Sequence, residues 1–502
     1  MTHGGRILVD QLRANGVDTV YCVPGESYLA ALDGLYDRSD IRTVVCRQEG
    51  GAAMMAEAHG KLTGRPGICF VTRGPGATNA AIGVHIARQD STPMILFVGL
   101  PATGVADREA FQEFDLTTTF GALGKWAGVI NDADRIPEYV NRAFNAALSG
   151  RPGPVVIGLP EDVLSRTGNV KPTGEARPAY PSPRAADMAV LAERLFEANR
   201  PLAIIGGPGW STAVKSRLEA FASRFNLPVG VAFRYQDYFD NTHPSYVGHI
   251  GIGLAPTSCE RIEKADLLLV LGARLGEITT QGYRVPKRND PSQYLVHVHP
   301  SADELGSVYQ ANLPICATAE TFTAALADLK PREAPDWAPW RTSARENYEA
   351  LLEPKTTPGA VKLETIMQQM SDMLPEGAII TNGAGNYTAW IHRYRQFTNY
   401  RSHLGSTAGA MGYGVPAAIA AKHLHPERTV VAFAGDGCFL MNGQEMATAA
   451  QYGLPIIIVV INNAMYGTIR MHQERAYPDR VMATSLMNPD FAAMAQSFGG
   501  HG

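Results

Sequence analysis

The sequence predicts an α/β fold made of three doubly wound, parallel-sheet domains. The strongest evidence is the stretch 429–463, where two short apolar strands flank a helical segment in the pattern of a parallel βαβ unit. Short apolar runs alternate with helical segments in the same way through the first third of the chain. Two proline-rich stretches, 167–184 and 330–358, interrupt this alternation as linkers do. The predicted domains are therefore 1–166, 185–330 and 359–502.

Composition describes an ordinary globular protein of 502 residues, with 45% hydrophobic and 18% charged side chains. The net charge of −4 and the lack of a long basic run argue against nucleic acid and anionic membranes as partners. The longest apolar run, 456–461, is too short to span a bilayer, and the N-terminus has no apolar signal core. The six cysteines contain no CxxC pair, which is typical of reduced thiols in a cytoplasmic protein.

In the first domain, strands are expected at 17–23, 43–46, 67–72 and 94–98. The first strand enters a turn that contains Gly25 and Glu26, and the second leads through Glu49 into a helix. The third leads into a glycine-rich loop that ends at Asn79. In an open α/β sheet such turns lie at the carboxyl edge, where ligands bind. Glu49 should therefore lie at the mouth of the sheet, although a glutamate there could simply be favoured by the helix dipole.

The second domain is expected to contain strands at 201–205, 267–271 and 294–298. The proline-rich segment 330–358 that follows carries Trp337 and Trp340. We interpret it as a connector that docks on the folded chain.

In the third domain, the strand 429–434 ends in Gly435, Asp436 and Gly437, and the strand 456–461 ends in two asparagines, the second being Asn463. A right-handed crossover through the helix 444–452 would place both strand ends on one edge of the sheet. A carboxylate and an amide oxygen suit Mg²⁺, and glycine-flanked backbone amides suit a phosphate. The pattern predicts a metal–diphosphate site, although a lone GDG is common in loops. Cys438 is either a small buried residue or a cofactor contact.

This combination resembles the thiamine diphosphate motif, in which GDG is followed by a paired asparagine. The resemblance implies that Mg²⁺ is held by the side chains of Asp436 and Asn463 and by the backbone carbonyl of Met465. Diphosphate oxygens and water would complete the shell. Tyr466 and Gly467, which come next, belong to the same implied cofactor loop.

A wider resemblance covers nearly the whole chain. The segments 47–49 and 74–79 resemble the pyrimidine-binding domain of the acetolactate (acetohydroxyacid) synthase family. That resemblance implies that the Glu49 carboxyl bonds N1′ of the cofactor pyrimidine, and that Gln112, in a segment matching the family's FQE, is catalytic. Gly409 and Met411 match the loop whose methionine lies beneath the cofactor, and 383–386 matches the diphosphate loop with Gly385 and Asn386. The alternatives are that Met411 is an ordinary core methionine and that 383–386 is an ordinary polar turn.

Several positions depart from the family. Glu26 replaces a glycine near the reacting carbon, and His472 replaces a tryptophan that shapes the acceptor pocket. We expect both to contribute to catalysis with a polar substrate, unless Glu26 only caps a helix and His472 faces solvent. Gly276, Ile278 and the 297–299 segment lack the charged groups expected for FAD, which is therefore doubtful. The family also continues beyond the position of Gly502, so we expect its C-terminal tail to be absent from this sequence.

The resemblance implies a thiamine diphosphate- and Mg²⁺-dependent enzyme of the transferase/lyase class. It would decarboxylate a 2-oxo acid and transfer the hydroxyalkyl carbanion to a carbonyl acceptor. A 2-oxo acid decarboxylase or another C–C lyase of the same family is one alternative. A non-catalytic cofactor-binding subunit is another, and the retention of Glu49, Met411, Asp436 and Asn463 argues against it. Because the family builds each active site from two subunits, a homodimer or homotetramer is implied.

Overall fold

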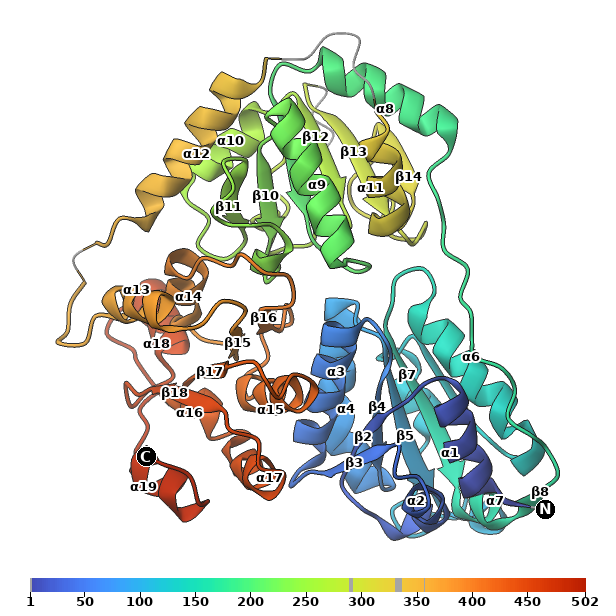
Figure 1. The fold of residues 1–502 in the computed structure, drawn as a ribbon. Helices are drawn as coiled ribbons and strands as arrows, with labels where there is room; N and C mark the ends of the chain where they lie inside the picture. The colour runs from blue at the N-terminus through green and yellow to red at the C-terminus, as the bar shows by residue number, and fades with distance from the viewer. Residues whose placement is uncertain (1, 289–291, 330–335, 356) are drawn as a thin grey trace. The chain divides into compact units, whose positions relative to one another are not determined.

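The computed structural model describes residues 2–288, 292–329, 336–355 and 357–502. These residues form three larger sheets of parallel strands flanked by helices, which confirms the predicted α/β class (Figure 1). They belong to two compact units. The first unit contains residues up to 179 together with 380–385 and 404–502, and the second contains 180–379 and 386–403.

The first unit begins with a six-stranded sheet of order β3-β2-β4-β5-β7-β6, in which all neighbours run parallel. Its strands are β2 (Thr19–Cys22), β3 (Arg42–Val45), β4 (Gly67–Val71), β5 (Met94–Leu100), β6 (Trp126–Val129) and β7 (Pro154–Pro160). Its helices are α1 (Gly4–Ala14), α2 (Leu29–Tyr36), α3 (Glu49–Thr63), α4 (Gly74–Asp90), α5 (Leu116–Gly121), α6 (Ile136–Leu148) and α7 (Glu161–Ser165). α1 and α6 cover one face of the sheet, and α3 and α4 cover the other (Figure 1). The sheet is buried on both faces, which explains its continuous apolar strands.

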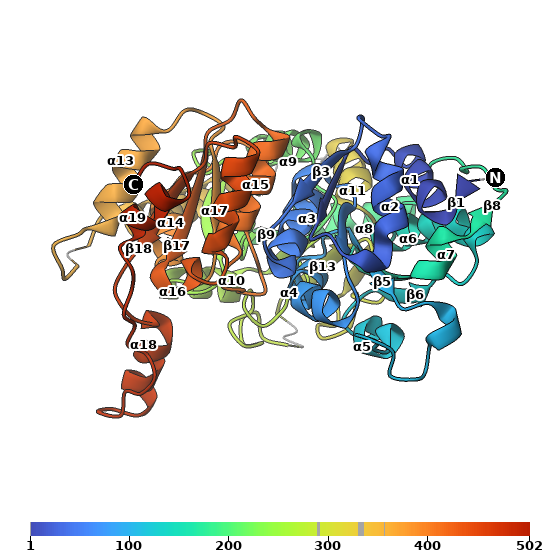
Figure 2. The ribbon, with the colours of Figure 1, turned by 90° about the horizontal axis from the view of Figure 1, so that it is seen from below.

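A sheet of order β16-β15-β17-β18 lies almost entirely in the same unit. Its strands are β15 (Ile379–Asn382), β16 (His403–Gly405), β17 (Val430–Gly435) and β18 (Ile457–Ile461), and its helices include α15 (Gly414–Leu424), α18 (Gly467–Ala476) and α19 (Phe491–Ser497). β17 and β18 pair in parallel with Gly435 opposite Ile461, so the predicted βαβ unit is confirmed. Between them, α17 (Met446–Gln451) lies within the predicted helix 444–452 and follows a 3-10 turn, and a further short helix, α16 (Asp436–Phe439), comes directly after β17. α15 packs against α3 of the first sheet (Figures 1 and 2).

The second unit contains a six-stranded parallel sheet of order β11-β10-β9-β12-β13-β14. The strands are β9 (Pro201–Ile205), β10 (Val229–Ala232), β11 (Tyr246–Ile250), β12 (Leu267–Leu271), β13 (Tyr294–His299) and β14 (Leu313–Cys316). The helices are α8 (Ala185–Glu197), α9 (Thr212–Phe225), α10 (Pro256–Lys264), α11 (Ala319–Ala327), α12 (Ala338–Leu352), α13 (Leu363–Met373) and α14 (Thr388–Tyr394). Apolar cores cover both faces of this sheet.

The two proline-rich segments, interpreted as a linker and as a docked connector, differ in structure. After β8 (Thr167–Gly168), which pairs with β1 (Thr2–His3), the chain forms no helix or strand until α8 begins. In the connector, by contrast, residues 338–352 form the helix α12, while 330–335 and 356 lie outside the described part. The indoles of Trp337 and Trp340 donate to the carbonyls of Ala198 and Pro201, both at 2.9 Å, so the described residues dock as predicted.

A buried ionic network joins the two sheets of the first unit. The Lys61 ammonium on α3 contacts the carboxylates of Glu57 and Asp90 and donates to the carbonyl of Gly405 at 3.2 Å. The Tyr413 hydroxyl donates to Glu57 at 2.6 Å, and the backbone amide of Thr407 donates to Asp90 at 2.9 Å. α3, α4 and the segment 405–413 are thereby held together. Burial lowers the pKa of Lys61, but the two carboxylates outweigh burial and raise it well above its ordinary value.

We predict that Lys61→Met lowers the free energy of unfolding by about 3–5 kcal/mol, because two buried carboxylates lose their counter-charge. Urea denaturation measures the loss. The control is Lys264→Met, whose pairing with Glu260 is exposed, and it should cost less than about 1 kcal/mol. Equal effects of the two substitutions would show that the buried network contributes no special stability.

Candidate active site

The carboxyl ends of β17 and β18 bring a carboxylate and several amides together. Asp436 directly follows β17 and is buried, at 3% exposure. The Asn488 amide donates both to the Asp436 carboxylate, at 2.7 Å, and to the side-chain oxygen of Asn462, at 2.9 Å. Sequence reasoning missed Asn488 and gave Asn462 no role, because no local pattern relates them to Asp436. The side-chain oxygen of Asn488 is buried and has no hydrogen-bond partner within the described residues.

The loop after β18 folds back on itself. Ala464 has a positive φ of 54°, and the backbone amide of Met465 donates to the Asn463 side-chain oxygen at 3.2 Å. The Met465 carbonyl accepts from the amide of Gly467 at 2.9 Å. Asn463 is exposed, and both acceptor oxygens keep a second lone pair. The carboxylate, amide and carbonyl oxygens at this edge are the donors that Mg²⁺ prefers.

Glycines at this edge allow close approach of the backbone. A side chain at Gly437 would lie 2.5 Å from the ring of Tyr466, and one at Gly467 would lie 2.9 Å from the Asn463 amide. Gly385, in the loop after β15, has a φ of 154°, and the next residue, Asn386, is exposed in the second unit. A larger residue at Gly437 or Gly467 would therefore collide with its neighbours, and one at Gly385 would have a strained backbone.

The loop that carries Met411 is clamped by the segment after Asp436. The Cys438 thiol is buried and accepts a hydrogen bond from the backbone amide of Gly412 at 3.1 Å. The Asn442 amide donates to the carbonyl of Gly412 at 3.1 Å. Gly409 and Gly412 both have positive φ, which glycine adopts without strain. Cys438 and Asn442 thus hold the loop 409–412 through Gly412, and Met411 is partly buried.

At the first sheet, the structure brings Glu49 and Asn79 together. Glu49 is the first residue of α3, and the Asn79 amide from α4 donates to its carboxylate at 2.9 Å. Gly76 lies beside the same carboxylate, since a side chain there would be 3.6 Å from its other oxygen. The partly exposed Glu49 is therefore oriented by a neutral donor.

Gly25 and Glu26 lie at the same sheet edge. A side chain at Gly25 would lie 2.5 Å from Thr72, so the turn after β2 packs tightly on the turn after β4. The Arg73 guanidinium is buried, and it donates to Glu26 at 3.3 Å and to Glu161 at 2.7 Å. Glu26 makes no cap of the helix that follows, because no side-chain capping bond forms there. The ion pair with Arg73 was not predicted.

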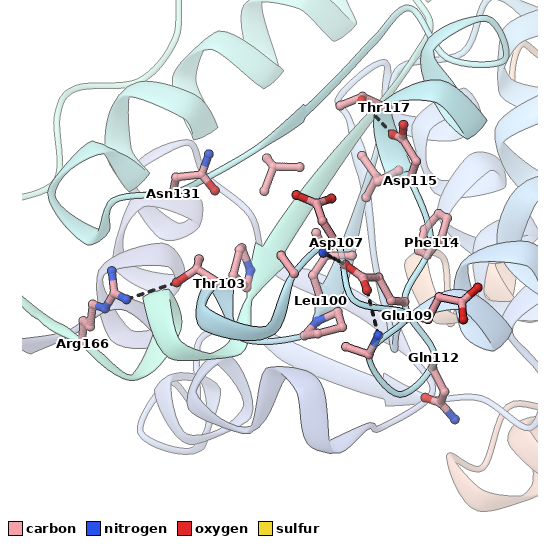
Figure 3. Close-up of a pocket in the computed structure, with 17 residues that line it drawn as sticks. Leu100, Thr103, Asp107, Glu109, Gln112, Phe114, Asp115, Thr117, Asn131 and Arg166 are labelled. Carbon is pink, nitrogen blue, oxygen red and sulfur yellow. Dashed lines mark hydrogen bonds between the residues drawn. The ribbon is translucent and has the colours of Figure 1, made fainter.

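A pocket of about 1070 Å³ opens at the carboxyl ends of β5, β6 and β7 (Figure 3). Gln112 lines it with a positive φ of 62°, and its side-chain oxygen is buried without a hydrogen-bond partner in the described chain. The Glu113 carboxylate closes the surrounding loop by accepting from the backbone amides of Asp107 at 2.7 Å and Ala110 at 2.8 Å. An unpaired acceptor beside a large pocket is suited to a polar ligand.

His472 lies on α18, which extends away from β17 and β18 in Figure 2, and its side chain is exposed. It makes no hydrogen bond with Glu26 in the described parts of the chain, so the structure does not bring these two residues together. Within those parts, no three His, Cys, Asp or Glu side chains cluster as metal ligands, and no helix is long and apolar enough to cross a bilayer.

Thiamine pyrophosphate enzyme domains match three parts of the chain: the N-terminal TPP binding domain at 2–119, the central domain at 188–326, and the C-terminal TPP binding domain at 383–502. The acetolactate synthase large subunit of Parasynechococcus marenigrum is 32% identical over 519 residues, which cover 99% of this chain and 82% of that protein. The chain belongs to the acetolactate synthase family of thiamine pyrophosphate enzymes.

Other family members give the same result. The acetolactate synthase isozyme 2 large subunit of Escherichia coli is 30% identical over 100% of this chain and 90% of that protein. The acetolactate synthase of Mycobacterium bovis is 29% identical over 99% of this chain and 82% of that protein. The predicted family and the predicted enzyme class are therefore confirmed, and thiamine diphosphate is the family's cofactor.

We predict that Asn488→Ala weakens the binding of thiamine diphosphate in Mg²⁺ buffer by about tenfold or more, because partners that orient a metal ligand commonly contribute 10–100-fold. Isothermal titration calorimetry measures the affinity. Asn399→Ala, in the second unit, is the control and should bind as the unchanged protein does. Equal affinity in both variants would show that Asp436 does not depend on Asn488.

Proposed function

We propose that this chain is a thiamine diphosphate- and Mg²⁺-dependent enzyme that decarboxylates a 2-oxo acid and transfers the remaining hydroxyalkyl group to a carbonyl acceptor. The observation that carries the proposal is the set of oxygen atoms that follow β17 and β18: the buried Asp436 carboxylate, the Asn463 side-chain oxygen and the Met465 carbonyl. Its oxygen donors fit a hard cation, and the chain's relatives are named acetolactate synthases.

In this proposal Mg²⁺ is held by the side chains of Asp436 and Asn463 and by the carbonyl of Met465. The amides near Gly437 and Gly385, with Asn386, would hold the diphosphate. Bound thiamine diphosphate supplies the carbon nucleophile and the electron sink for decarboxylation. The contacts of Gly412 with Cys438 and Asn442 support a fixed position for Met411 beneath the cofactor.

Glu49 is proposed to hold a proton at N1′ of the cofactor pyrimidine. The Asn79 amide occupies one of its carboxyl oxygens, which leaves the other for this contact. Gln112 is proposed to bond the reacting substrate through its unpaired oxygen, at the edge of the pocket in Figure 3. Glu26, fixed by Arg73, and His472 are proposed to favour a polar substrate; for His472 only the family position supports this.

We also propose the domain boundaries 1–166, 185–330 and 359–502, which the three matched ranges support. The proposed assembly is a homodimer or homotetramer in which Glu49 of one chain completes the metal site of another. The resemblance to the family supports this arrangement.

FAD is not proposed as a cofactor. At the ends of β12 and β13, Arg274 pairs with Glu304 at 3.0 Å, and the His297 imidazole contacts the carbonyl of Ala273 at 2.9 Å. His297 and His299 are buried. These side chains are engaged within the protein, so they fit a flavin poorly.

The test of the proposed function is to incubate the purified protein with thiamine diphosphate, Mg²⁺ and a panel of 2-oxo acids, with and without a second carbonyl compound. Mass spectrometry should detect CO₂ release together with a new C–C bonded product, and Asp436→Ala should form none. Aldehyde as the sole product would indicate a decarboxylase instead. Cofactor binding without turnover of any 2-oxo acid would indicate a non-catalytic subunit.

We predict that Glu49→Gln folds normally but slows proton exchange at C2 of thiamine diphosphate by a factor on the order of 10² or more, because the carboxyl that holds the N1′ proton is lost. NMR-detected deuterium exchange measures the rate. Glu161→Gln removes another carboxylate of the same sheet edge and should leave the rate unchanged. If both variants exchange at the unchanged rate, Glu49 has only a structural role.

We predict that protein purified without added flavin is colourless and fully active. The absorbance spectrum and the specific activity before and after flavin addition measure this. A yellow preparation that loses activity when its flavin is removed would contradict the prediction.

A further inference from the structure

The outer edge of the first sheet is completed by side chains from another part of the first unit. β3 is an edge strand, and its outward backbone groups need partners. The Tyr452 hydroxyl accepts from the amide of Val45 at 2.8 Å and donates to the carbonyl of Thr43 at 3.1 Å. The Glu445 carboxylate accepts from the amides of Arg47, at 3.1 Å, and Gln48, at 3.0 Å. Two side chains thus bond four backbone groups of residues 43–48.

Burial and several contacts hold the Glu445 carboxylate in this position. It is fully buried, and the Thr448 hydroxyl donates to its second oxygen at 2.5 Å. A side chain at Gly51 would lie 2.6 Å from its first oxygen, so α3 approaches it directly. Burial raises the pKa of Glu445, and the three donors oppose that shift. Burying a carboxylate without hydrogen-bond donors costs free energy, so the three donors are needed to keep Glu445 in this position.

The residue that follows these two bonded amides is Glu49. The bonded peptides of Arg47 and Gln48 set the direction in which the chain enters α3. The Gln48 side chain adds the helix cap by accepting from the amide of Gly51 at 3.0 Å. Asn79 orients only the tip of the Glu49 side chain. The backbone position of Glu49 therefore depends on a carboxylate supplied from the segment that follows Asp436.

We propose that Glu445 is a positioning residue for Glu49: its carboxylate fixes the 47–49 turn so that Glu49 can serve the cofactor. This inference rests on the role of Glu49 in the proposed function. Tyr452 covers the same strand edge but ends at Val45, before the turn. Substituting Tyr452 and Glu445 separately therefore distinguishes covering of the strand edge from positioning of Glu49.

The test compares Glu445→Met, which removes the acceptor, with Glu445→Gln, which keeps one acceptor oxygen for the two amides. Gly51→Ala adds a methyl group on α3 that would collide with the Glu445 carboxylate. Tyr452→Phe removes only the contacts to Thr43 and Val45. For each variant we would measure backbone amide exchange over residues 44–50, thermal unfolding, thiamine diphosphate affinity by calorimetry, and C2 proton exchange of the bound cofactor.

We expect Glu445→Met and Gly51→Ala to lose amide protection at 47–48 and to slow C2 exchange at least tenfold. Glu445→Gln should stay within about threefold of the unchanged protein. Tyr452→Phe should lower the unfolding temperature without slowing C2 exchange. If Glu445→Met does not fold, unprotected amides at Arg47 and Gln48 in the unchanged protein would overturn the proposal.

Three further outcomes would also overturn it. Unchanged C2 exchange in Glu445→Met, with Glu49→Gln slow, would refute the positioning role while leaving the proposed function intact. Unchanged exchange in Glu49→Gln itself would refute both together. Equal slowing by Tyr452→Phe would show that any loss at this sheet edge has the same effect.

Discussion

The constraint on which the first unit depends is a single ammonium group shared by two buried carboxylates. Lys61 meets Glu57 and Asp90 where α3, α4 and the segment 405–413 converge. Charges removed from water require nearly complete pairing, so these three elements can meet in only one register. α3 runs from this network to Glu49, and α4 runs from it to Asn79 near its N-terminus. The segment 405–413 runs from it to Met411. By fixing these three elements, the Lys61 network sets the positions of three proposed cofactor contacts, Glu49, Asn79 and Met411.

The short segment from Asp436 to Glu445 performs several tasks at once. It supplies the proposed metal ligand, and its Cys438 and Asn442 bond both sides of Gly412. Its last residue, Glu445, bonds the turn before Glu49. Each of these contacts restricts which side chains and backbone conformations the segment can have. Of this segment, only its last two residues belong to the predicted helix 444–452, and the short helix α16 comes before them.

Much of this arrangement follows from sequence because parallel strands deliver their carboxyl ends to one edge. That rule located Asp436 with the asparagines after β18, and it located Glu49 near Asn79. The rule gives positions of backbone turns, not of side-chain partners. Asn488, Arg73 and Glu445 bond residues far away in the chain, and no local pattern marks such pairs. Glu26 shows the limit well: its place at the sheet edge was predictable, but its buried arginine partner was not.

The closed loop around the pocket in Figure 3 has a consequence for acidic conditions. The backbone amides of Asp107 and Ala110 lower the pKa of Glu113, which means that folding favours its ionised form. This support is complete above the carboxyl's ordinary pKa and is lost as the pH falls through the lowered value. The loop, which also carries Gln112, would then relax. Amide exchange over 107–113 during an acid titration would reveal this relaxation as an early loss of protection in the loop.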